Sequence, residues 1–364
     1  MRVNFFVGLL VCLCVSLGLS TARAQNVTIT PIGAAAGEFC VGDRALLFED
    51  PTGVKVLIAP GRTVGLDMGG AVNVRGSADP RLGGSVHVLL IDHPHVDHIG
   101  EVFHTNCAGD PAVSKQFEFP SEGNAPEIAA RLNSAVLVGG ELPDFFTKKL
   151  SNMVTLAGTA APVGCPATGL ESKFTVPRAS PCVGVIRGGT RTAVHASQGA
   201  NGDGVKITTI PAFHAGGVSR LHVDPLGGID PGVPEGLTGY AGSETGYIIR
   251  FTNGLSVLWT GDSGLIGDWA TQAKFYGVNL AVVHGGDLFT MGPDEAAFAV
   301  NQLIKPRSAI PEHFNQVSTS KGKVLPNTRV ERFIQQLKGQ ASSRVVVPLS
   351  GVPIQCDGHG NCSQ

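Results

Sequence analysis

A short stretch near position 95 carries the residues best suited to metal chemistry. Four ligand-type side chains lie there within six positions of one another: His93, His95, Asp97 and His98. They follow the apolar run 86–91, which is typical of a buried strand, and Pro94 prevents that strand from continuing. The four side chains therefore lie on a turn at a strand end, where they can converge on zinc or a similar divalent ion. The alternative, a polar loop with incidental histidines, explains this spacing poorly.

Further ligand-type residues stand where other predicted strands end. His214 follows the run 205–210, Asp262 follows 255–259, and His313 follows 308–311. Each repeats the geometry of the first motif, with a ligand-type side chain just past a strand. Asp67 ends an early apolar run in the same way, although an aspartate before two glycines is also ordinary turn chemistry.

The elements that must position these residues change in character along the chain. The first two thirds consist mainly of short β-like runs and turns, with a short helix expected over 141–150. Asn253-Gly254 between two apolar runs predicts a hairpin. The last third alternates strands with helices, which we expect over 263–275, 293–303 and 329–337. The Gly, Ala, Pro and Thr-rich segment 155–201 is expected to be an irregular insertion held by a disulfide. This order of elements fits two packed sheets with helices outside.

The stretch 93–98 resembles the HxHxDH motif of the metallo-β-lactamase superfamily of metal-dependent hydrolases. The five strand ends also follow the order and residue types of that superfamily's five motifs. The resemblance implies an α/β fold, the αββα four-layer sandwich, and two divalent metal ions. One ion would be held by His93, His95 and His214, and the other by Asp97, His98 and His313, with Asp262 bridging both. Zinc is the expected metal, with manganese or iron as alternatives.

The resemblance also implies roles beyond metal binding. Asp97 and Asp262 would be catalytic, with Asp97 orienting a hydroxide formed from a bridging water whose pKa the metals lower to roughly 7. Asp67 matches the superfamily's aspartate that supports the metal loop from behind. His284 ends a strand next to those that carry Asp262 and His313, so we expect it near the metals without binding them. A histidine hydrogen-bonded within its own loop is the alternative.

A second run narrows the resemblance to the ascorbate-phosphate-lactonase-like branch of the superfamily. The residues MGPDEAA at 291–297 and IPEHF at 310–314 resemble that branch's "MGPEEA … IPMH" run. The chain departs from the branch at Asp92, where threonine is usual, and before MGP, where the segment is commonly Pro-x-Gly-Gly and here reads VHGGD at 283–287. Its N-terminus and its cysteines also differ from the cytosolic sugar-phosphate enzymes of the branch.

The N-terminus has the features of a secretory signal peptide over residues 1–24. A positive start precedes an apolar core at 5–19, and Ala-Arg-Ala at 22–24 offers a small-x-small cleavage site. Residues 25–350 would then form the hydrolase domain and 351–364 a cysteine-containing tail. The expected location is periplasmic or secreted, with a retained N-terminal anchor as the alternative.

The charge of the mature chain excludes some partners. Loss of Arg2 and Arg23 with the signal reduces Lys plus Arg from 27 to 25, against 29 acidic residues, so the formal charge is near −4. The sequence contains no basic patch that would track a phosphate backbone. We therefore expect a small-molecule substrate, no nucleic acid, and no membrane contact after signal cleavage.

Six cysteines remain once the signal is removed, an even number that suits an oxidising compartment. The pairs expected from position are Cys356–Cys362 and Cys165–Cys182, which leaves Cys40 and Cys107. Other connectivities are formally open. A thiolate metal site is the alternative, but the chain has no C-x-x-C spacing to support it.

The expected function is a secreted dinuclear hydrolase that cleaves a small ester, lactone or phosphoester. A β-lactam is the alternative substrate. The other alternative is a non-hydrolytic metal-binding or redox protein, although redox members of the superfamily carry a carboxylate where His95 stands. The insertions 105–130, 155–201 and 221–244 should shape the pocket, and His195 and His222 are candidates for substrate contact at its mouth.

Overall fold

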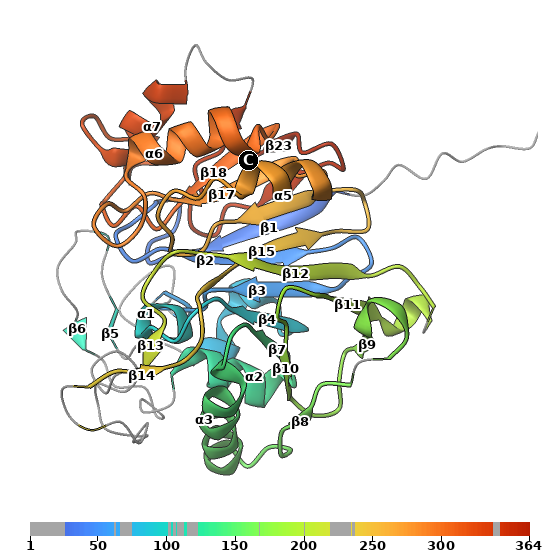
Figure 1. The fold of residues 1–364 in the computed structure, drawn as a ribbon. Coiled ribbons are helices and arrows are strands. Elements are labelled where there is room, and N and C mark those ends of the chain that lie inside the picture. Colours follow the sequence, from blue (N-terminus) through green and yellow to red (C-terminus); the bar gives the residue numbers. More distant parts are fainter. Residues whose placement is uncertain are drawn as a thin grey trace, which may run out of the picture.

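The computed structural model describes residues 26–61, 63–65, 75–100, 103–104, 107, 113–114, 123–166, 168–199, 201–218, 234, 237–337 and 343–364. Within these residues two large β-sheets lie face to face, and helices cover their outer faces (Figure 1).

The two sheets are mixed, and their described strands come from all parts of the chain. The first sheet has the order β23 (Cys362–Ser363), β22 (Ile354–Cys356), β1 (Val27–Ile32), β2 (Ala45–Glu49), β3 (Lys55–Ile58), β4 (Val88–Ile91), β7 (Ala135–Val138), β10 (Cys182–Val185) and β8 (Val163–Gly164). The second has the order β21 (Arg344–Val345), β18 (Ser308–Glu312), β17 (Leu280–His284), β16 (Ser256–Trp259), β15 (Thr245–Arg250), β12 (Val205–Pro211), β11 (Thr190–His195) and β9 (Lys173–Val176).

Strand direction decides which strand ends share an edge. In the first sheet β3, β4, β7 and β10 are parallel, and in the second β16, β17, β18 and β21 are parallel. β12 is antiparallel to β15, which is antiparallel to β16. The carboxyl ends of β12, β16, β17 and β18 therefore lie at one edge of the second sheet, where an open α/β sheet presents its binding residues.

Alternate side chains of the central strands enter different layers of the core. In β3, Val56 and Ile58 belong to the core between the sheets, whereas Leu57 packs outward. In β16, Val257 lies in the same central core and Leu258 packs outward on the other side. This period of two residues is what strands buried on both faces require.

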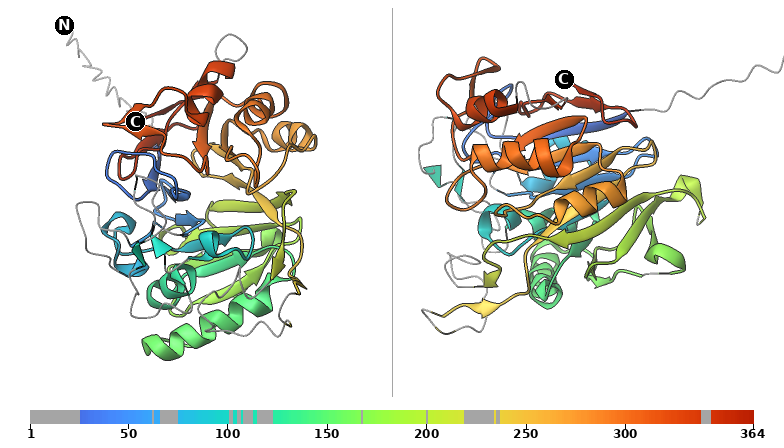
Figure 2. Two further views of the ribbon diagram at one scale, coloured as in Figure 1. Left: turned by 90° about the vertical axis from the view of Figure 1, so that its left-hand side faces the viewer. Right: turned by 45° about the horizontal axis from the view of Figure 1, so that its top comes forward.

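The outward-facing side chains are covered by helices. α2 (Asn124–Leu132) and α3 (Leu142–Ala157) pack on the first sheet, and α5 (Trp269–Tyr276), α6 (Pro293–Phe298) and α7 (Arg329–Leu337) on the second. Figures 1 and 2 show these two helical layers on opposite sides of the paired sheets. The predicted αββα four-layer sandwich is confirmed.

Local sequence explains several boundaries. The predicted hairpin joins β15 to β16, with Gly254 at a φ of 99° and Asn253 Oδ1 accepting a hydrogen bond from Leu255 N at 2.9 Å. The helix expected from position 263 begins only at Trp269, because the intervening segment contains two glycines and glycine disfavours helix. It ends at Gly277, whose φ of 62° closes the helix in the left-handed conformation.

The segment 155–201 is not the irregular insertion that its composition suggested. It contributes β8 and β10 to the first sheet and β9 and β11 to the second, so it widens both. Phe174, Val176 and Ala193 from this segment are buried in the central core. The four strands are short, from two to six residues each.

Three disulfides join described residues: Cys40–Cys107, Cys165–Cys182 and Cys356–Cys362. Two are the pairs expected from position, and the third joins the two cysteines left over. β22, which carries Cys356, pairs with β1 and extends the first sheet. Among the described residues, no helix combines the length and the apolar character needed to cross a lipid bilayer.

Candidate metal centre

The strand ends bring together all seven side chains that the sequence predicts as ligands. β4 leads into His93 and the one-turn helix α1 (Val96–Ile99), β12 leads into His214, β16 into Asp262 and β18 into His313. The donor atoms form two groups, each with all atoms within 4.8 Å of one another. The first group contains His93, His95 and His214, and the second contains Asp97, His98, Asp262 and His313.

Asp262 stands between the two groups. Its Oδ2 atom lies 3.3 Å from His98 Nε2 and 3.4 Å from His313 Nε2. The same oxygen lies 3.8 Å from His93 Nε2 and 3.8 Å from His214 Nε2, in the other group. One carboxylate oxygen thus faces ring nitrogens from both groups, as a bridging ligand would.

The donor set fits a divalent ion. His93, His98, His313 and Asp262 are all at most 3% exposed. The Nε2 atoms of these three histidines are buried and make no hydrogen bond within the described part of the chain. Buried polar atoms without a partner are uncommon in folded proteins. Imidazoles that converge on a carboxylate in this way suit zinc, manganese or iron.

Comparison with known proteins agrees with this arrangement. No family model matches the chain. A UPF0173 metal-dependent hydrolase from Cupriavidus taiwanensis is 26% identical over 344 residues, which cover 93% of this chain and 96% of that protein. Another from Cupriavidus necator is 28% identical over 74% of this chain and 69% of its own length. The chain is thus similar, over most of its length, to proteins named as metal-dependent hydrolases.

The chain is also similar to solved structures at low sequence identity. A metallo hydrolase from Ignicoccus hospitalis is 20% identical, with a TM-score of 0.49 over 90% of this chain and 98% of that one. A metallo-β-lactamase fold protein from Bacillus subtilis is 13% identical, with a TM-score of 0.46 over 91% of this chain and 99% of that one.

The turn that carries Asp97 and His98 depends on a close backbone approach. His98 N donates a hydrogen bond to His95 O at 3.0 Å, which closes the single turn of α1. A Cβ atom on Gly61 would lie only 1.6 Å from Asp97 O. Glycine at position 61 therefore lets the loop after β3 pack against the turn that carries Asp97 and His98.

Asp92 contacts two of the predicted ligand histidines, His93 and His98, at their Nδ1 atoms. Its Oδ1 atom lies 3.2 Å from His93 Nδ1 and 3.0 Å from His98 Nδ1, and it also accepts a hydrogen bond from His93 N at 3.0 Å. Trp259 Nε1 donates to its other oxygen at 3.5 Å. The hydrogen bond to His93 Nδ1 and the ion-pair contact with His98 Nδ1 lie on the side of each ring away from Nε2, and both Nε2 atoms face Asp262.

Asp92, His98 and Asp262 stabilise one another's charged forms. Burial alone would raise the pKa of Asp92, but His98 and His93 outweigh it and hold that pKa well below its ordinary value. Burial alone would lower the pKa of His98, but Asp92 and Asp262 raise it to about 9. Burial likewise opposes ionisation of Asp262, and His313 and His98 outweigh it, so its pKa is well below normal. Both aspartates are therefore carboxylates, the form that binds metal.

His284 contacts the oxygen of Asp262 that faces away from the histidine ligands. Its Nδ1 atom lies 3.0 Å from Asp262 Oδ1, and its backbone N–H donates to Thr260 Oγ1 at 3.1 Å. Glu312, its partner in the β17–β18 register, places Oε2 3.9 Å from His284 Nε2. Burial raises the pKa of Glu312 well above its ordinary value. His284 thus lies beside the centre and touches a predicted ligand.

Two of the other expectations fall outside the described residues: Asp67 and His222. The expectation that His195 lies at the pocket mouth is wrong. β11 is antiparallel to β12, so the carboxyl end of β11 lies at the edge opposite His214. His195 there packs edge-on against His87, with ring centroids 5.7 Å apart.

Sequence reasoning missed several buried charged residues around the centre. Asp92 was noted only as a departure from a motif, and Glu312, Glu244 and Arg44 were not considered. Glu244 Oε2 accepts a hydrogen bond from His214 N at 3.3 Å. The one available signal was a charged residue directly beside an apolar run, as at Asp92 and Arg44.

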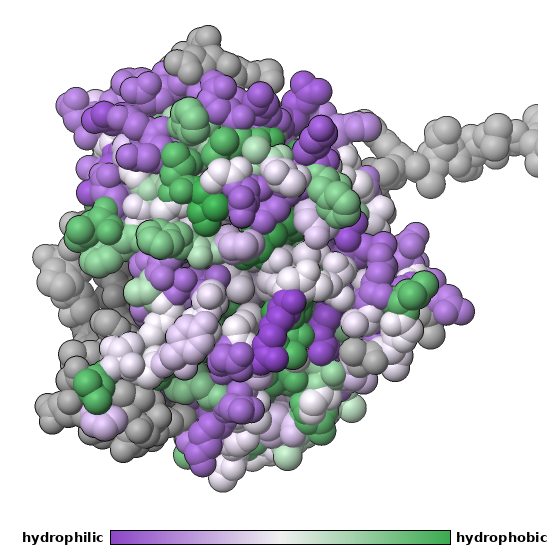
Figure 3. Space-filling model, in the orientation of Figure 1, coloured by the Kyte–Doolittle hydropathy of each residue, from purple (hydrophilic) through white to green (hydrophobic). Residues whose placement is uncertain are grey.

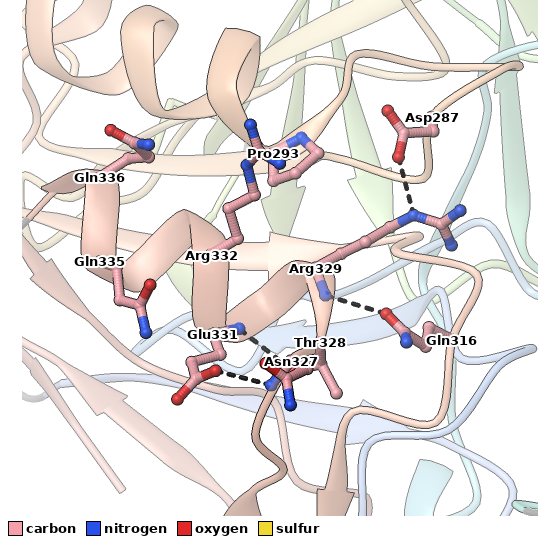
Figure 4. Close-up of a pocket in the computed structure, with 10 residues that line it drawn as sticks. All are labelled: Asp287, Pro293, Gln316, Asn327, Thr328, Arg329, Glu331, Arg332, Gln335 and Gln336. Carbon is pink, nitrogen blue, oxygen red and sulfur yellow. Dashed lines mark hydrogen bonds and ion pairs between the residues drawn. The ribbon is translucent and has the colours of Figure 1, made fainter.

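A polar cavity of about 680 Å³ lies beside α7 (Figure 4). None of the seven predicted ligands is among the residues that line it. Arg329 is central in it, with Nε donating to Asp287 Oδ2 at 2.9 Å. Its Nη1 atom donates to the carbonyl oxygens of Phe314 and Asn315, both at 3.2 Å. These bonds hold the loop directly after His313, so the side chain at the cavity's centre supports the metal centre from outside.

Proposed function

We propose that this metal-dependent hydrolase is dinuclear and cleaves a small ester, lactone or phosphoester. The observation that carries the proposal is the position of Asp262 Oδ2 between ring nitrogens of both donor groups. One ion would be held by His93, His95 and His214, and the other by Asp97, His98 and His313, with Asp262 shared. Zinc is the proposed metal, and manganese or iron suits the same donors.

Bound metal ions would lower the pKa of a water to roughly 7 and polarise the substrate's carbonyl or phosphoryl oxygen. Asp262 and Asp97 would have different roles in this reaction. Asp262 is buried, 3% exposed, and is fixed by His284, so it serves to hold geometry. The side chain of Asp97 is 21% exposed, and its carboxylate is placed to accept a proton from the attacking water.

The loops after the strand ends favour a substrate with an apolar group. Four large apolar side chains are exposed on them: Phe213, Leu265, Leu288 and Phe289. Ser263 ties these loops together, because its Oγ accepts from Phe213 N and its carbonyl oxygen accepts from Met291 N, both at 2.9 Å. Figure 3 shows hydrophobic side chains on the left-hand side of the molecule, where Figure 1 places the loops that follow β17. The mature charge near −4 fits neutral esters or lactones.

A substrate panel tests the function. Aryl esters, lactones, phosphodiesters and β-lactams are offered to the reconstituted wild type and to Asp262→Ala. We expect hydrolysis of an ester, lactone or phosphodiester that Asp262→Ala abolishes. A wild type that cleaves nothing above this variant, or that cleaves only β-lactams, contradicts the proposal.

A chain-length series tests the apolar contact separately. Among esters that differ only in acyl length, kcat/KM should rise by up to roughly fourfold per methylene in the wild type. Phe213→Ser should flatten this rise. Phe275 is a matched control, because it is 79% exposed on α5 while Phe213 is 78% exposed beside His214. Equal slopes in wild type and Phe213→Ser reject the apolar contact and leave the hydrolase proposal standing.

We also propose that the chain is exported and loses residues 1–24. The support is the signal-like N-terminus together with three disulfides. N-terminal sequencing of protein from the periplasm or medium should begin at Gln25. Thiol titration of the denatured, unreduced protein should find no free thiol, and two or more reactive thiols contradict the pairing.

A further inference from the structure

A buried arginine lies inside the second donor group. Arg44 immediately precedes β2, and its side chain is only 2% exposed. Its Nη1 atom contacts Asp97 Oδ2, and its Nη2 atom lies 3.5 Å from Asn315 Oδ1, two residues after His313. The guanidinium therefore reaches from the first sheet to the loop that follows β18.

The contacted oxygen is the one that faces the histidines of that group. Asp97 Oδ2 lies 3.7 Å from His98 Nε2 and 3.5 Å from His313 Nε2. A metal ion held by these three residues would bind at the same oxygen. The guanidinium and the ion would therefore compete for one carboxylate oxygen, Asp97 Oδ2.

The first donor group has different neighbours. Asp92 is common to both groups, with Oδ1 3.2 Å from His93 Nδ1 and 3.0 Å from His98 Nδ1. In the first group the backbone N–H of His214 donates to the carboxylate of Glu244, whereas Arg44 contacts Asp97 in the second. Carboxylates near a metal position attract the ion, whereas an arginine side chain keeps its positive charge at every pH a protein tolerates. The two positions are thus unequal in their fixed charge.

We propose that Arg44 acts as a resident cation on Asp97 and lowers the affinity of the second position, so that the two positions fill in sequence. This rests on the ligand assignment proposed above. A second ion must displace the guanidinium from Asp97 Oδ2 and then sit beside its positive charge. The first ion, held by His93, His95 and His214, meets neither opposition.

Zinc titration of the stripped protein, followed by competition with a chromogenic chelator, tests the proposal. The wild type should bind zinc in two steps. Arg44→Met keeps most of the side-chain volume without the charge, and it should bind the second equivalent roughly 10- to 100-fold more tightly, with the first unchanged. Arg44→Lys keeps the charge and should stay near wild type at the second step.

Arg332→Met is the matched control, because Arg332 pairs with an aspartate, Asp294, on the surface and its loss changes the total charge equally. It should titrate as wild type. A single affinity for both equivalents in the wild type overturns the proposal, and so does a second step in Arg44→Met that is unchanged or weaker.

Two further outcomes are informative. If Arg44→Met does not fold, the wild-type and Arg44→Lys titrations decide. Second-step tightening in Arg44→Lys by more than about tenfold would show that charge is not the cause, and overturn the proposal. Failure of the wild type to bind even a first equivalent would instead reject the ligand assignment itself.

Discussion

Two pairs of histidines lie at opposite edges of the sandwich, and they differ in their hydrogen-bond partners and in their pKa values. At the carboxyl edge, the rings of His98 and His313 are 5.5 Å apart. At the amino edge, the rings of His87 and His195 are 5.7 Å apart. Ring spacing therefore does not distinguish the two groups.

Their hydrogen-bond partners do. His87 Nδ1 accepts a hydrogen bond from Lys55 N at 3.0 Å, and His195 Nδ1 lies 2.7 Å from Ser197 Oγ. In contrast, the Nε2 atoms of His98 and His313 are buried without a hydrogen bond and point at one carboxylate oxygen. Convergence of unpaired nitrogens on a carboxylate, rather than the presence of histidines, identifies the metal centre.

The pKa values of one histidine from each group, His87 and His98, also differ. His313 does not share the raised value of His98, because burial and Arg44 hold its pKa well below the ordinary value. Burial, His195 and Lys55 together lower the pKa of His87 to about 4. Burial acts on His98 in the same direction, but Asp92 and Asp262 reverse the result and raise its pKa to about 9. The buried carboxylates beside His98 thus favour its protonated form, whereas the surroundings of His87 favour its neutral form.

The largest expected effect comes from removing a ligand on one side of this comparison. His98→Ala or His313→Ala should lose chiefly one metal equivalent, because each imidazole belongs to the second donor group. His195→Ala should lose none. Elemental analysis after reconstitution measures this, and a metal loss in His195→Ala equal to that in His98→Ala would contradict the account.

The pH dependence of stability sharpens the comparison. A raised folded pKa stabilises below the unfolded value of 6.5, and this stabilisation is lost as the pH rises through about 9. The unfolding free energy of the stripped protein should thus fall by on the order of 3 kcal/mol between pH 6.5 and 9 from His98. His87 acts oppositely: its lowered pKa means that stability is lost as the pH falls from 6.5 through about 4.

Urea unfolding of the metal-stripped protein at a series of pH values measures both limbs. His98→Gln should reduce the loss of unfolding free energy between pH 6.5 and 9. His87→Gln should reduce the loss between pH 6.5 and 4 and leave the loss at higher pH unchanged. A wild type whose stability is constant or rises between pH 6.5 and 9 would show that the carboxylates do not hold a proton on His98.

A smaller effect is expected at Asp92. Asp92→Asn should weaken metal binding roughly 10- to 100-fold at both positions, because Asp92 contacts His93 of one group and His98 of the other. Asp50→Asn is the matched control, since Asp50 is also buried but accepts hydrogen bonds from Thr252 near the amino edge. Chelator competition reads out both. Equal metal affinity in the Asp92 and Asp50 variants would remove Asp92 from the account.

The smallest change is expected at His284. His284→Ala should keep both metal equivalents and lower turnover by roughly tenfold, because the ring only orients Asp262 through Oδ1. Metal content and kcat are measured on the same preparation. Loss of an equivalent would make His284 a ligand, and unchanged kcat would make its contact with Asp262 merely structural.

The sequence predicted the ligand-type residues well because each depends on local pattern, an apolar run followed by a histidine or aspartate. The same pattern predicted the layered fold, since strands of period two and amphipathic helices must bury their apolar sides. His195 was misplaced because a strand's direction depends on its neighbours, here the antiparallel pairing of β11 with β12.

Residues that act across the sheets could not be found in this way. Arg44 contacts Asp97 across 53 positions of sequence, and locally it is only a charged residue before an apolar strand. Glu312 faces His284 through strand register, which the sequence does not display. The strands of segment 155–201 were hidden by a loop-like composition, since four residues suffice for a strand when a sheet edge is available, even where one is Lys173 or Gly184.

The most direct test of the account is the metal stoichiometry of the wild type beside that of Asp262→Ala. Stripped protein is reconstituted with zinc, freed of excess metal by gel filtration, and analysed for metal per folded chain. Because Asp262 Oδ2 faces both donor groups, the account predicts about two equivalents in the wild type and loss from both positions in the variant. A wild type that holds one equivalent with every ligand intact, or a variant that keeps two, would contradict it.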